Sequence, residues 1–314
     1  METQQAPNIT KRPDWLKVRV PSSKNYHSIR GMLKDLGLVT VCQEALCPNI
    51  DECWGGGTAT FMLMGDTCTR ACRFCAVKTG NPKGILDLEE PTKVGYAISQ
   101  MNLDYVVLTS VDRDDLDDLG SGHFAKTIST IKEHNPKMIV ECLTPDFNSE
   151  KRFIEKVIES GPEVFAHNIE TVERLTPTVR DRRSQYRPSL ETLRLAKEIK
   201  SNQYTKTSIM LGLGEKDGEV IQSLHDLREV GCDVVTFGQY LAPTARHKKF
   251  LPIVEYVHPD KFAMFKEEAD KLGFMYVASG PLVRSSYKAG EYFMKGVIES
   301  ERESITSLKT YPIQ

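Results

Sequence analysis

The sequence predicts an α/β fold: a partial (βα)6 barrel with N-terminal and C-terminal extensions that cap it. From residue 59 to residue 239, short apolar segments alternate with amphipathic ones, the order expected of a parallel sheet covered by helices. The chain has 314 residues, of which 40% are hydrophobic, enough for one large domain of this kind. Six strand–helix units, rather than eight, predict an incomplete barrel.

Six segments are predicted to be buried parallel strands because they are largely apolar and several are rich in β-branched residues. They are residues 59–64, 105–110, 138–143, 164–169, 206–211 and 233–239. Helices with one apolar face are predicted over residues 150–160, 190–200 and 218–230. In barrels of this kind the reactive groups gather at the carboxyl ends of the strands.

Both ends of the chain depart from this pattern. Residues 1–25 carry several prolines and mixed charges, which predict an extended arm, and a short helix is expected over residues 26–36. Beyond residue 240 we expect a helix at 260–272, a strand at 274–278 and a helix at 291–300. The predicted division is therefore an N-terminal extension, 1–57, a barrel core, 58–240, and a C-terminal extension, 241–314.

Composition excludes several classes of protein. The net charge of −2 gives no general attraction to nucleic acid, and no run of 18 apolar residues predicts a membrane span. Residues 1–17 resemble neither a signal peptide nor an Arg- and Ser-rich transit peptide. We therefore expect a cytoplasmic protein with reduced thiols.

Six of the eight cysteines form two triplets within residues 42–75. The triplets are Cys42, Cys47 and Cys53, and Cys68, Cys72 and Cys75. Disulfides suit short secreted chains, and zinc sites usually have four ligands in paired knuckles. Each triplet is one thiolate short of four, so iron–sulfur clusters are favoured over zinc or small core residues.

The CxxxCxxC spacing of the second triplet resembles that of the radical S-adenosylmethionine (SAM) superfamily. Three cysteines can hold three irons of a cubane cluster, which leaves the fourth iron open to a small molecule. The resemblance implies that the amine and carboxylate of SAM bind this iron and that an electron from the cluster releases a 5′-deoxyadenosyl radical. It also implies that Phe74 lies near the adenine.

Longer segments of the chain resemble the lipoyl synthase family. The matching segments are GGGTATFMLMGDTCTRACRFCAV at 55–77, VVLTSVDRDDLDDLGSGHFA at 106–125, HNIETVERL at 167–175, VRDRR at 179–183, IMLGLGE at 209–215, FGQYLAPT at 237–244 and ASGPLVRSSYKAGE at 278–291. Together they span the chain from about residue 26 to residue 298.

This resemblance implies a second, auxiliary 4Fe–4S cluster on Cys42, Cys47 and Cys53, with Ser286 of the RSSY segment as its fourth ligand. The implied reaction inserts two sulfur atoms, drawn from that cluster, at the sixth and eighth carbons of an octanoyl-lysyl group. No catalytic residue beyond the cluster ligands is implied. The implied partners are octanoylated lipoyl carrier domains of 2-oxoacid dehydrogenase complexes and of the glycine cleavage system, a ferredoxin- or flavodoxin-type reductant, and an iron–sulfur carrier that rebuilds the cluster.

Polar residues at strand ends are the candidates for binding SAM. Asn168 and Glu170 end the fourth strand, and the resemblance implies that they hydrogen-bond the ribose and the methionyl part of SAM, with a helix cap as the alternative role. Thr109 and Ser110, at the end of the second strand, are weaker candidates of the same kind. The arginines at 180, 182 and 183 either meet the SAM carboxylate or form surface ion pairs. The acidic run at 112–118 either binds a cation or partner or, as the pattern favours, forms a solvated loop.

Other interpretations stay open from the sequence. Cys142 and Cys232 are expected to be small core residues, although either could replace Ser286 as a cluster ligand. The basic residues 246–249 form either a docking patch for an acidic carrier domain or a solvated loop. The alternative functions are another radical SAM sulfur-inserting enzyme of the biotin synthase kind, an iron–sulfur carrier or electron-transfer protein, and a zinc-stabilised binding module.

Overall fold

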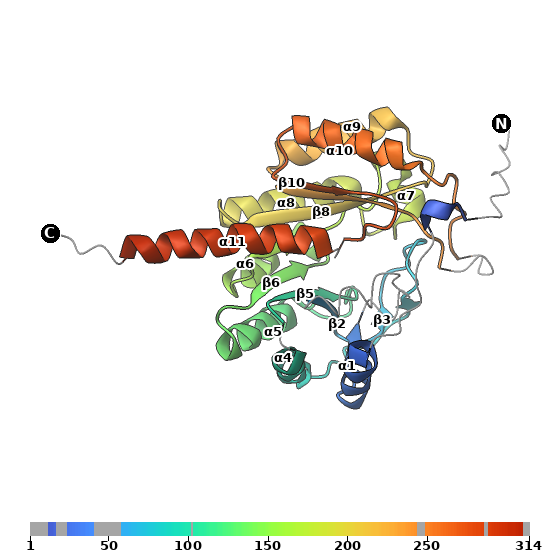
Figure 1. Ribbon diagram of the computed structural model, residues 1–314. Helices are drawn as coiled ribbons and strands as arrows, with labels where there is room; N and C mark the ends of the chain where they lie inside the picture. Colours follow the sequence, from blue (N-terminus) through green and yellow to red (C-terminus); the bar gives the residue numbers. More distant parts are fainter. Residues whose placement is uncertain are drawn as a thin grey trace.

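An eight-stranded sheet runs through the computed structural model, which describes residues 12–16, 24–40, 58–101, 103–243, 249–285 and 288–309. The strands, in their order across the sheet, are β1 (Val39–Thr40), β2 (Thr58–Leu63), β5 (Tyr105–Ser110), β6 (Ile139–Leu143), β7 (Val164–Ala166), β8 (Tyr204–Leu211), β9 (Val234–Gln239) and β10 (Tyr276–Ser279). Every neighbouring pair from β2 to β10 is parallel, whereas β1 is antiparallel to β2. The predicted α/β partial barrel is confirmed (Figure 1).

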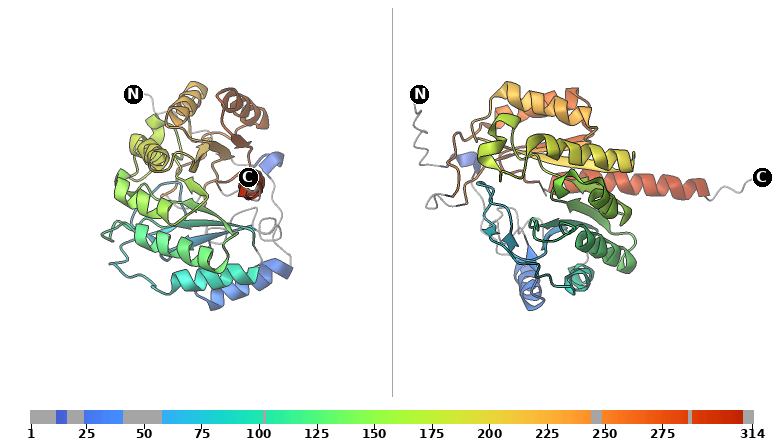
Figure 2. Two further views of the ribbon diagram at one scale, coloured as in Figure 1. Left: turned by 90° about the vertical axis from the view of Figure 1, so that its left-hand side faces the viewer. Right: turned by 180° about the vertical axis from the view of Figure 1, so that it is seen from behind.

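Helices cover the outer face of this curved sheet (Figure 2). They are α4 (Glu90–Met101), α5 (Ser121–His134), α6 (Lys151–Glu159), α8 (Tyr186–Ile199), α9 (Asp217–Glu229) and α10 (Pro259–Lys271), with α1 (Lys24–Asp35) beside α4. Alternate strand residues such as Val106 and Leu108 are fully buried in the apolar layer between sheet and helices. None of the described helices has both the length and the apolar character needed to cross a membrane.

The sheet continues beyond the sixth predicted strand. β10 pairs in parallel with β9, and α10 packs against α9 and β10, so residues 259–279 repeat the strand–helix pattern of the core. The sequence suggested a C-terminal extension for these residues because the strand–helix pattern changes after residue 240. The boundaries drawn at residues 57 and 240 stay predictions.

The inner face of the sheet is closed at one end by α11 (Lys288–Lys309), which is longer than the predicted 291–300. Its buried residues Met294 and Ile298 pack against inward-facing strand residues such as Tyr105. Lys295 Nζ lies 2.7 Å from Asp104 Oδ2, and Asp104 immediately precedes β5. This helix therefore covers the amino ends of the strands and leaves the carboxyl ends open.

The second cysteine triplet lies at those carboxyl ends, in the long connection between β2 and α4. Two short paired strands shape this connection: β3 (Thr67–Cys68) and β4 (Lys78–Thr79). The predicted auxiliary ligands Cys42, Cys47, Cys53 and Ser286 lie outside the described residues.

Candidate active site

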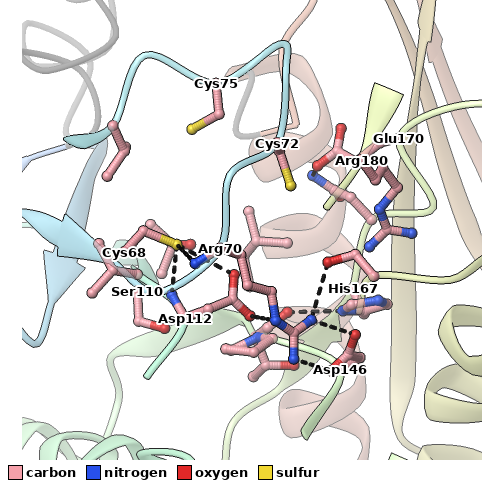
Figure 3. A pocket seen from close by; sticks show the side chains of 18 of the residues that line it. Cys68, Arg70, Cys72, Cys75, Ser110, Asp112, Asp146, His167, Glu170 and Arg180 are labelled. Carbon is pink, nitrogen blue, oxygen red and sulfur yellow. Dashed lines mark hydrogen bonds and ion pairs between the residues drawn. The ribbon is translucent and has the colours of Figure 1, made fainter. Parts of the chain in front are cut away.

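A cavity of about 260 Å³ opens at the carboxyl ends of β2, β5, β6 and β7. All three thiols of the second triplet line it (Figure 3). Phe74 is also one of the lining residues. Thr109, Ser110, Asn168 and Glu170 also line it. Of the three arginines proposed for the SAM carboxylate, Arg180 lines the cavity and Arg182 and Arg183 do not.

Backbone N–H groups point at two of the cysteine sulfurs. Cys68 Sγ accepts from the N–H groups of Arg70 (3.4 Å) and Asp112 (3.3 Å), and Cys72 Sγ accepts from that of Asp181 (3.3 Å). Burial nevertheless raises the pKa of Cys68 to about 12 and that of Cys72 to about 11, and it raises the pKa of Cys75 as well. The thiols therefore hold their protons until a bound metal displaces them.

The spread of the thiols suits a cluster. Among the described residues, no three His, Cys, Asp or Glu side chains converge as ligands of one metal ion would. In a cubane cluster each cysteine binds a different iron, so the sulfurs surround the cluster rather than one point. Three thiols around one cavity, with N–H donors aimed at their sulfurs, fit a 4Fe–4S cluster that keeps one iron open.

Several polar groups that line the cavity have unused hydrogen-bonding capacity. Arg180 is buried, and its Nε has no partner among the described residues; nor does the buried Oγ of Ser110. Asn168 Nδ2 donates to Glu170 Oε1 at 3.1 Å, while burial raises the pKa of the Glu170 carboxyl. Glu170 also has a φ of 65°, a conformation that non-glycine residues seldom adopt and that tends to occur at functional sites.

A buried hydrogen-bond chain fixes Arg180. Its Nη1 donates to Ser189 Oγ at 2.8 Å, and Ser189 Oγ lies 2.9 Å from His167 Nε2. His167 Nδ1 lies 2.9 Å from the carbonyl oxygen of Thr144, which can only accept, so Nδ1 carries the proton and Nε2 accepts from Ser189. Burial and the charge of Arg180 lower the pKa of His167 to about 4, so the ring is neutral. In the sequence, only its place next to Asn168 points to His167.

The acidic run after β5 is not a solvated loop, so that prediction is wrong. Asp114 pairs with Arg70 at 3.0 Å, and Asp115 pairs with the buried Arg113 at 2.9 Å. Asp118 accepts from the backbone N–H groups of Gly120 and Gly122 at the start of α5. These carboxylates are internal partners of the cysteine-bearing connection and of a helix end.

The remaining candidates fall into two groups. Cys142 and Cys232 are completely buried in the apolar layers outside the sheet and do not line the cavity, so the core role is confirmed and a ligand role is wrong. Lys249 lines the cavity and donates to the carbonyl oxygen of Val77 at 3.2 Å and to Thr79 Oγ1 at 3.1 Å. Residues 246–248 of the basic patch lie outside the described residues.

Two family models match the chain. The model for the radical SAM superfamily matches residues 62–227, and the model for the N-terminal domain of lipoyl synthase of the radical SAM family matches residues 2–47. The first match covers the strands and the connection that form the cavity.

Curated relatives match almost the whole chain. "Lipoyl synthase, mitochondrial" of Schizosaccharomyces pombe is 58% identical over 307 residues, which are 96% of this chain and 82% of that protein. The protein of the same name from Drosophila mojavensis is 55% identical over 309 residues, 97% of this chain and 83% of that protein.

Among solved structures, the chain is similar to the FeFe-hydrogenase maturase HydG from Carboxydothermus hydrogenoformans, with a TM-score of 0.56 and 12% identity over 80% of this chain and 65% of that chain. At this identity the similarity concerns the fold alone. The family models and the curated relatives confirm the resemblance seen in the sequence: the chain belongs to the lipoyl synthase family of the radical SAM superfamily.

Proposed function

We propose that this protein is a lipoyl synthase, which inserts two sulfur atoms at the sixth and eighth carbons of an octanoyl-lysyl group. One observation carries the proposal: the three thiols of the CxxxCxxC segment line the same cavity as Ser285, the neighbour of the predicted auxiliary ligand Ser286. A radical source and a sulfur source must face each other closely in such a reaction, because a radical that attacks an unactivated C–H bond has to form beside its target. Identity of 58% to a protein named lipoyl synthase supports the same conclusion.

On one side of the cavity, Cys68, Cys72 and Cys75 would hold the 4Fe–4S cluster to which SAM binds. The bound cluster and SAM supply a 5′-deoxyadenosyl radical. The Nε of Arg180, which has no partner within the described part of the chain, suits the SAM carboxylate because a guanidinium N–H makes its strongest hydrogen bonds to an anion. The carboxyl of Glu170, oriented by Asn168, suits a donor such as the amine or a ribose hydroxyl.

On the other side, Cys42, Cys47, Cys53 and Ser286 would hold the auxiliary cluster. Support comes from the turn at 280–285, which is held by hydrogen bonds from Gly280 N–H to the carbonyl oxygen of Phe237 (3.1 Å) and from Gln239 N–H to that of Pro281 (3.3 Å). This turn brings Ser285 to the cavity. A serine oxygen is a harder ligand than thiolate and should leave iron more readily, which suits a cluster that gives up its sulfur.

The substrates and partners follow from the proposed reaction. They are octanoylated lipoyl carrier domains, a ferredoxin- or flavodoxin-type reductant, and a carrier that rebuilds the auxiliary cluster. The names of the curated relatives favour the mitochondrion over the cytoplasm that the sequence predicted. No observation favours a biotin-synthase-like enzyme, an iron–sulfur carrier or a zinc module.

The test is anaerobic reconstitution with iron and sulfide, followed by SAM, dithionite and an octanoyl-lysyl peptide. We expect about eight irons per chain, 5′-deoxyadenosine and a dithiolane product. Cys68→Ala should abolish SAM cleavage, Cys42→Ala should retain cleavage without sulfur transfer, and the core variant Cys142→Ala should retain both. About four irons per chain, or identical behaviour of Cys68→Ala and Cys42→Ala, would contradict the two-cluster assignment.

A further inference from the structure

Arg70, inside the CxxxCxxC segment, is a buried cation surrounded by carboxylates. Its guanidinium lies 2.6 Å from Asp146 Oδ2, 3.0 Å from Asp114 Oδ1 and 3.2 Å from Asp112 Oδ1. Arg70 is 4% exposed, so water contributes little to its screening. Three anions therefore share one cation directly beside the cluster site.

These three carboxylates are not equally compensated. Asp146 accepts two hydrogen bonds from Arg70, at 2.6 and 2.9 Å, and Asp114 has a second cation in Arg183, at 3.0 Å. Asp112 has the longest of the three contacts to Arg70. The negative charge least neutralised by a direct partner therefore resides on Asp112.

Of the three aspartates around Arg70, Asp112 also lies nearest to a predicted cluster ligand. Its Oδ2 lies 3.7 Å from Cys68 Sγ, and its backbone N–H donates to the same sulfur at 3.3 Å. The N–H group is a dipole that favours negative charge on the sulfur, whereas the carboxylate opposes it. One residue thus acts on the cluster ligand in two opposite senses, and only the second depends on its side chain.

A second buried arginine fixes the backbone around this arrangement. Arg113 donates to the carbonyl oxygen of Met64 at 3.3 Å and to that of Ile85 at 2.8 Å, on either side of the cysteines. The segment that follows β5 is therefore tied to the cysteine-bearing connection at both of its ends. The backbone of Asp112, next to Arg113, is therefore held close to Cys68.

We propose that Asp112 and Arg70 are positioning residues that set the reduction potential of the SAM-binding cluster through opposite electrostatic effects. Net charge and hydrogen bonds around the sulfurs are among the factors that set such potentials. Reduction adds a negative charge, so the Asp112 carboxylate disfavours the reduced cluster and the Arg70 guanidinium favours it. A lower potential makes the cluster a stronger donor of the electron that SAM cleavage consumes. The proposal rests on the proposed function, in that the three cysteines hold this cluster.

The test is a potentiometric titration of the anaerobically reconstituted full-length protein, followed by electron paramagnetic resonance. Only the signal that changes on addition of SAM is followed, which separates this cluster from the auxiliary one. Asp112→Asn should raise the midpoint potential by about 59 mV, which for one electron is a tenfold change in the ratio of reduced to oxidised cluster. Arg70→Gln should lower it. The matched control is Asp117→Asn, which makes the same charge change at an exposed position of the same segment and should leave the potential as in the wild type.

Arg70→Lys separates charge from geometry, because lysine keeps the positive charge and loses the planar fork. Arg70→Lys should keep the wild-type potential. It also provides the test of the role of Arg70 if the Arg70→Gln variant does not take up iron. Shifts of Asp112→Asn and Arg70→Gln in the same direction would indicate a merely structural role and overturn the proposal. So would a wild-type potential in Asp112→Asn. A wild-type protein without any SAM-responsive cluster would instead refute the proposed function, and this proposal with it.

Discussion

Gly238, on β9, lies beneath the turn that leads to the RSSY segment. A Cβ at this position would stand 2.2 Å from the carbonyl oxygen of Val283 and 3.2 Å from its carbonyl carbon. Heavy atoms closer than about 3 Å repel each other strongly, so Gly238→Ala has to displace that carbonyl group by about 1 Å. Ser285 follows two residues later and lines the cavity. A displacement of about 1 Å in a catalytic arrangement costs on the order of 10²-fold in rate.

The assay compares two products of the reconstituted enzyme. Gly238→Ala should lower formation of the dithiolane product about 10²-fold. 5′-Deoxyadenosine should still form, because the cysteines that hold the SAM-binding cluster follow β2, and four strands of the sheet separate β2 from β9. Gly280→Ala is the matched control in the same turn, since its Cβ would meet the nearest atom, Val283 Cγ2, at an ordinary 3.5 Å. Equal product formation by the two variants would refute the argument, and so would a parallel loss of both products in Gly238→Ala.

Three further predictions concern buried ionisable side chains. Lys206→Met leaves Glu141 buried without the ammonium that lies 2.8 Å away, so the free energy of unfolding in urea should fall by about 3–5 kcal/mol, and adding Glu141→Gln should restore most of it. His167 has a folded pKa of about 4, below its unfolded value of 6.5, so the unfolded chain binds the extra proton between these values and stability falls as pH decreases. Because of His167, the free energy of unfolding of the apoprotein should fall by about 1.4 kcal/mol between pH 7.5 and pH 5.5. The variant His167→Gln should lack this part of the pH dependence. Arg180→Gln should raise the dissociation constant of SAM about tenfold or more at unchanged iron content, whereas the exposed Arg182→Gln should not, as calorimetric titration of the reconstituted protein would show.

Much of the sheet could be predicted because buried parallel strands are continuous apolar runs. Residues 105–110 coincide with β5, and the other core strands begin and end within two residues of the prediction except β7. β7 ends at Ala166, whereas the predicted strand extends to residue 169. His167 and Asn168, which follow β7, have polar side chains that line the cavity. The regular strand therefore ends before them, although the apolar residue Ile169 comes next in the sequence.

The helices α4 and α5 were not singled out by their pattern. α4 buries Val94, Ala97 and Ile98, but glycine and alanine make up part of its inner face and weaken the contrast with its outer face. α5 begins after Gly120, whose φ of 84° is a left-handed conformation and which has no side chain to cap the helix. The acceptor for the N–H of Gly122 is Asp118, which precedes the usual cap position by two residues. In both cases tertiary packing supplies what the local pattern lacks.

The candidate site likewise contains residues that the sequence could identify and residues that it could not. The cysteines could be identified because ligand type and short spacing are local properties of the sequence. The role of Arg70 could not, since its partners Asp114 and Asp146 lie 44 and 76 residues away along the chain. An acidic run next to a strand therefore suggested solvent exposure. Asp114 instead pairs with Arg70 of the cysteine-bearing connection, and Asp115 pairs with Arg113 of the run itself.

The inside of the barrel argues for entry of the substrate from one side only. One layer below the cavity, Glu141 and Lys206 form a buried ion pair, and Tyr105 donates to the same carboxylate at 2.7 Å. A further layer down, Met294 of α11 is completely buried against the amino ends of the strands. These layers fill the interior as side chains fill small barrels. Because a carbon-centred radical has to be shielded from water, a filled floor suits this chemistry. An octanoyl chain on a carrier domain would then approach from the carboxyl ends of the strands, where the cavity is lined by the three thiols and by Ser285.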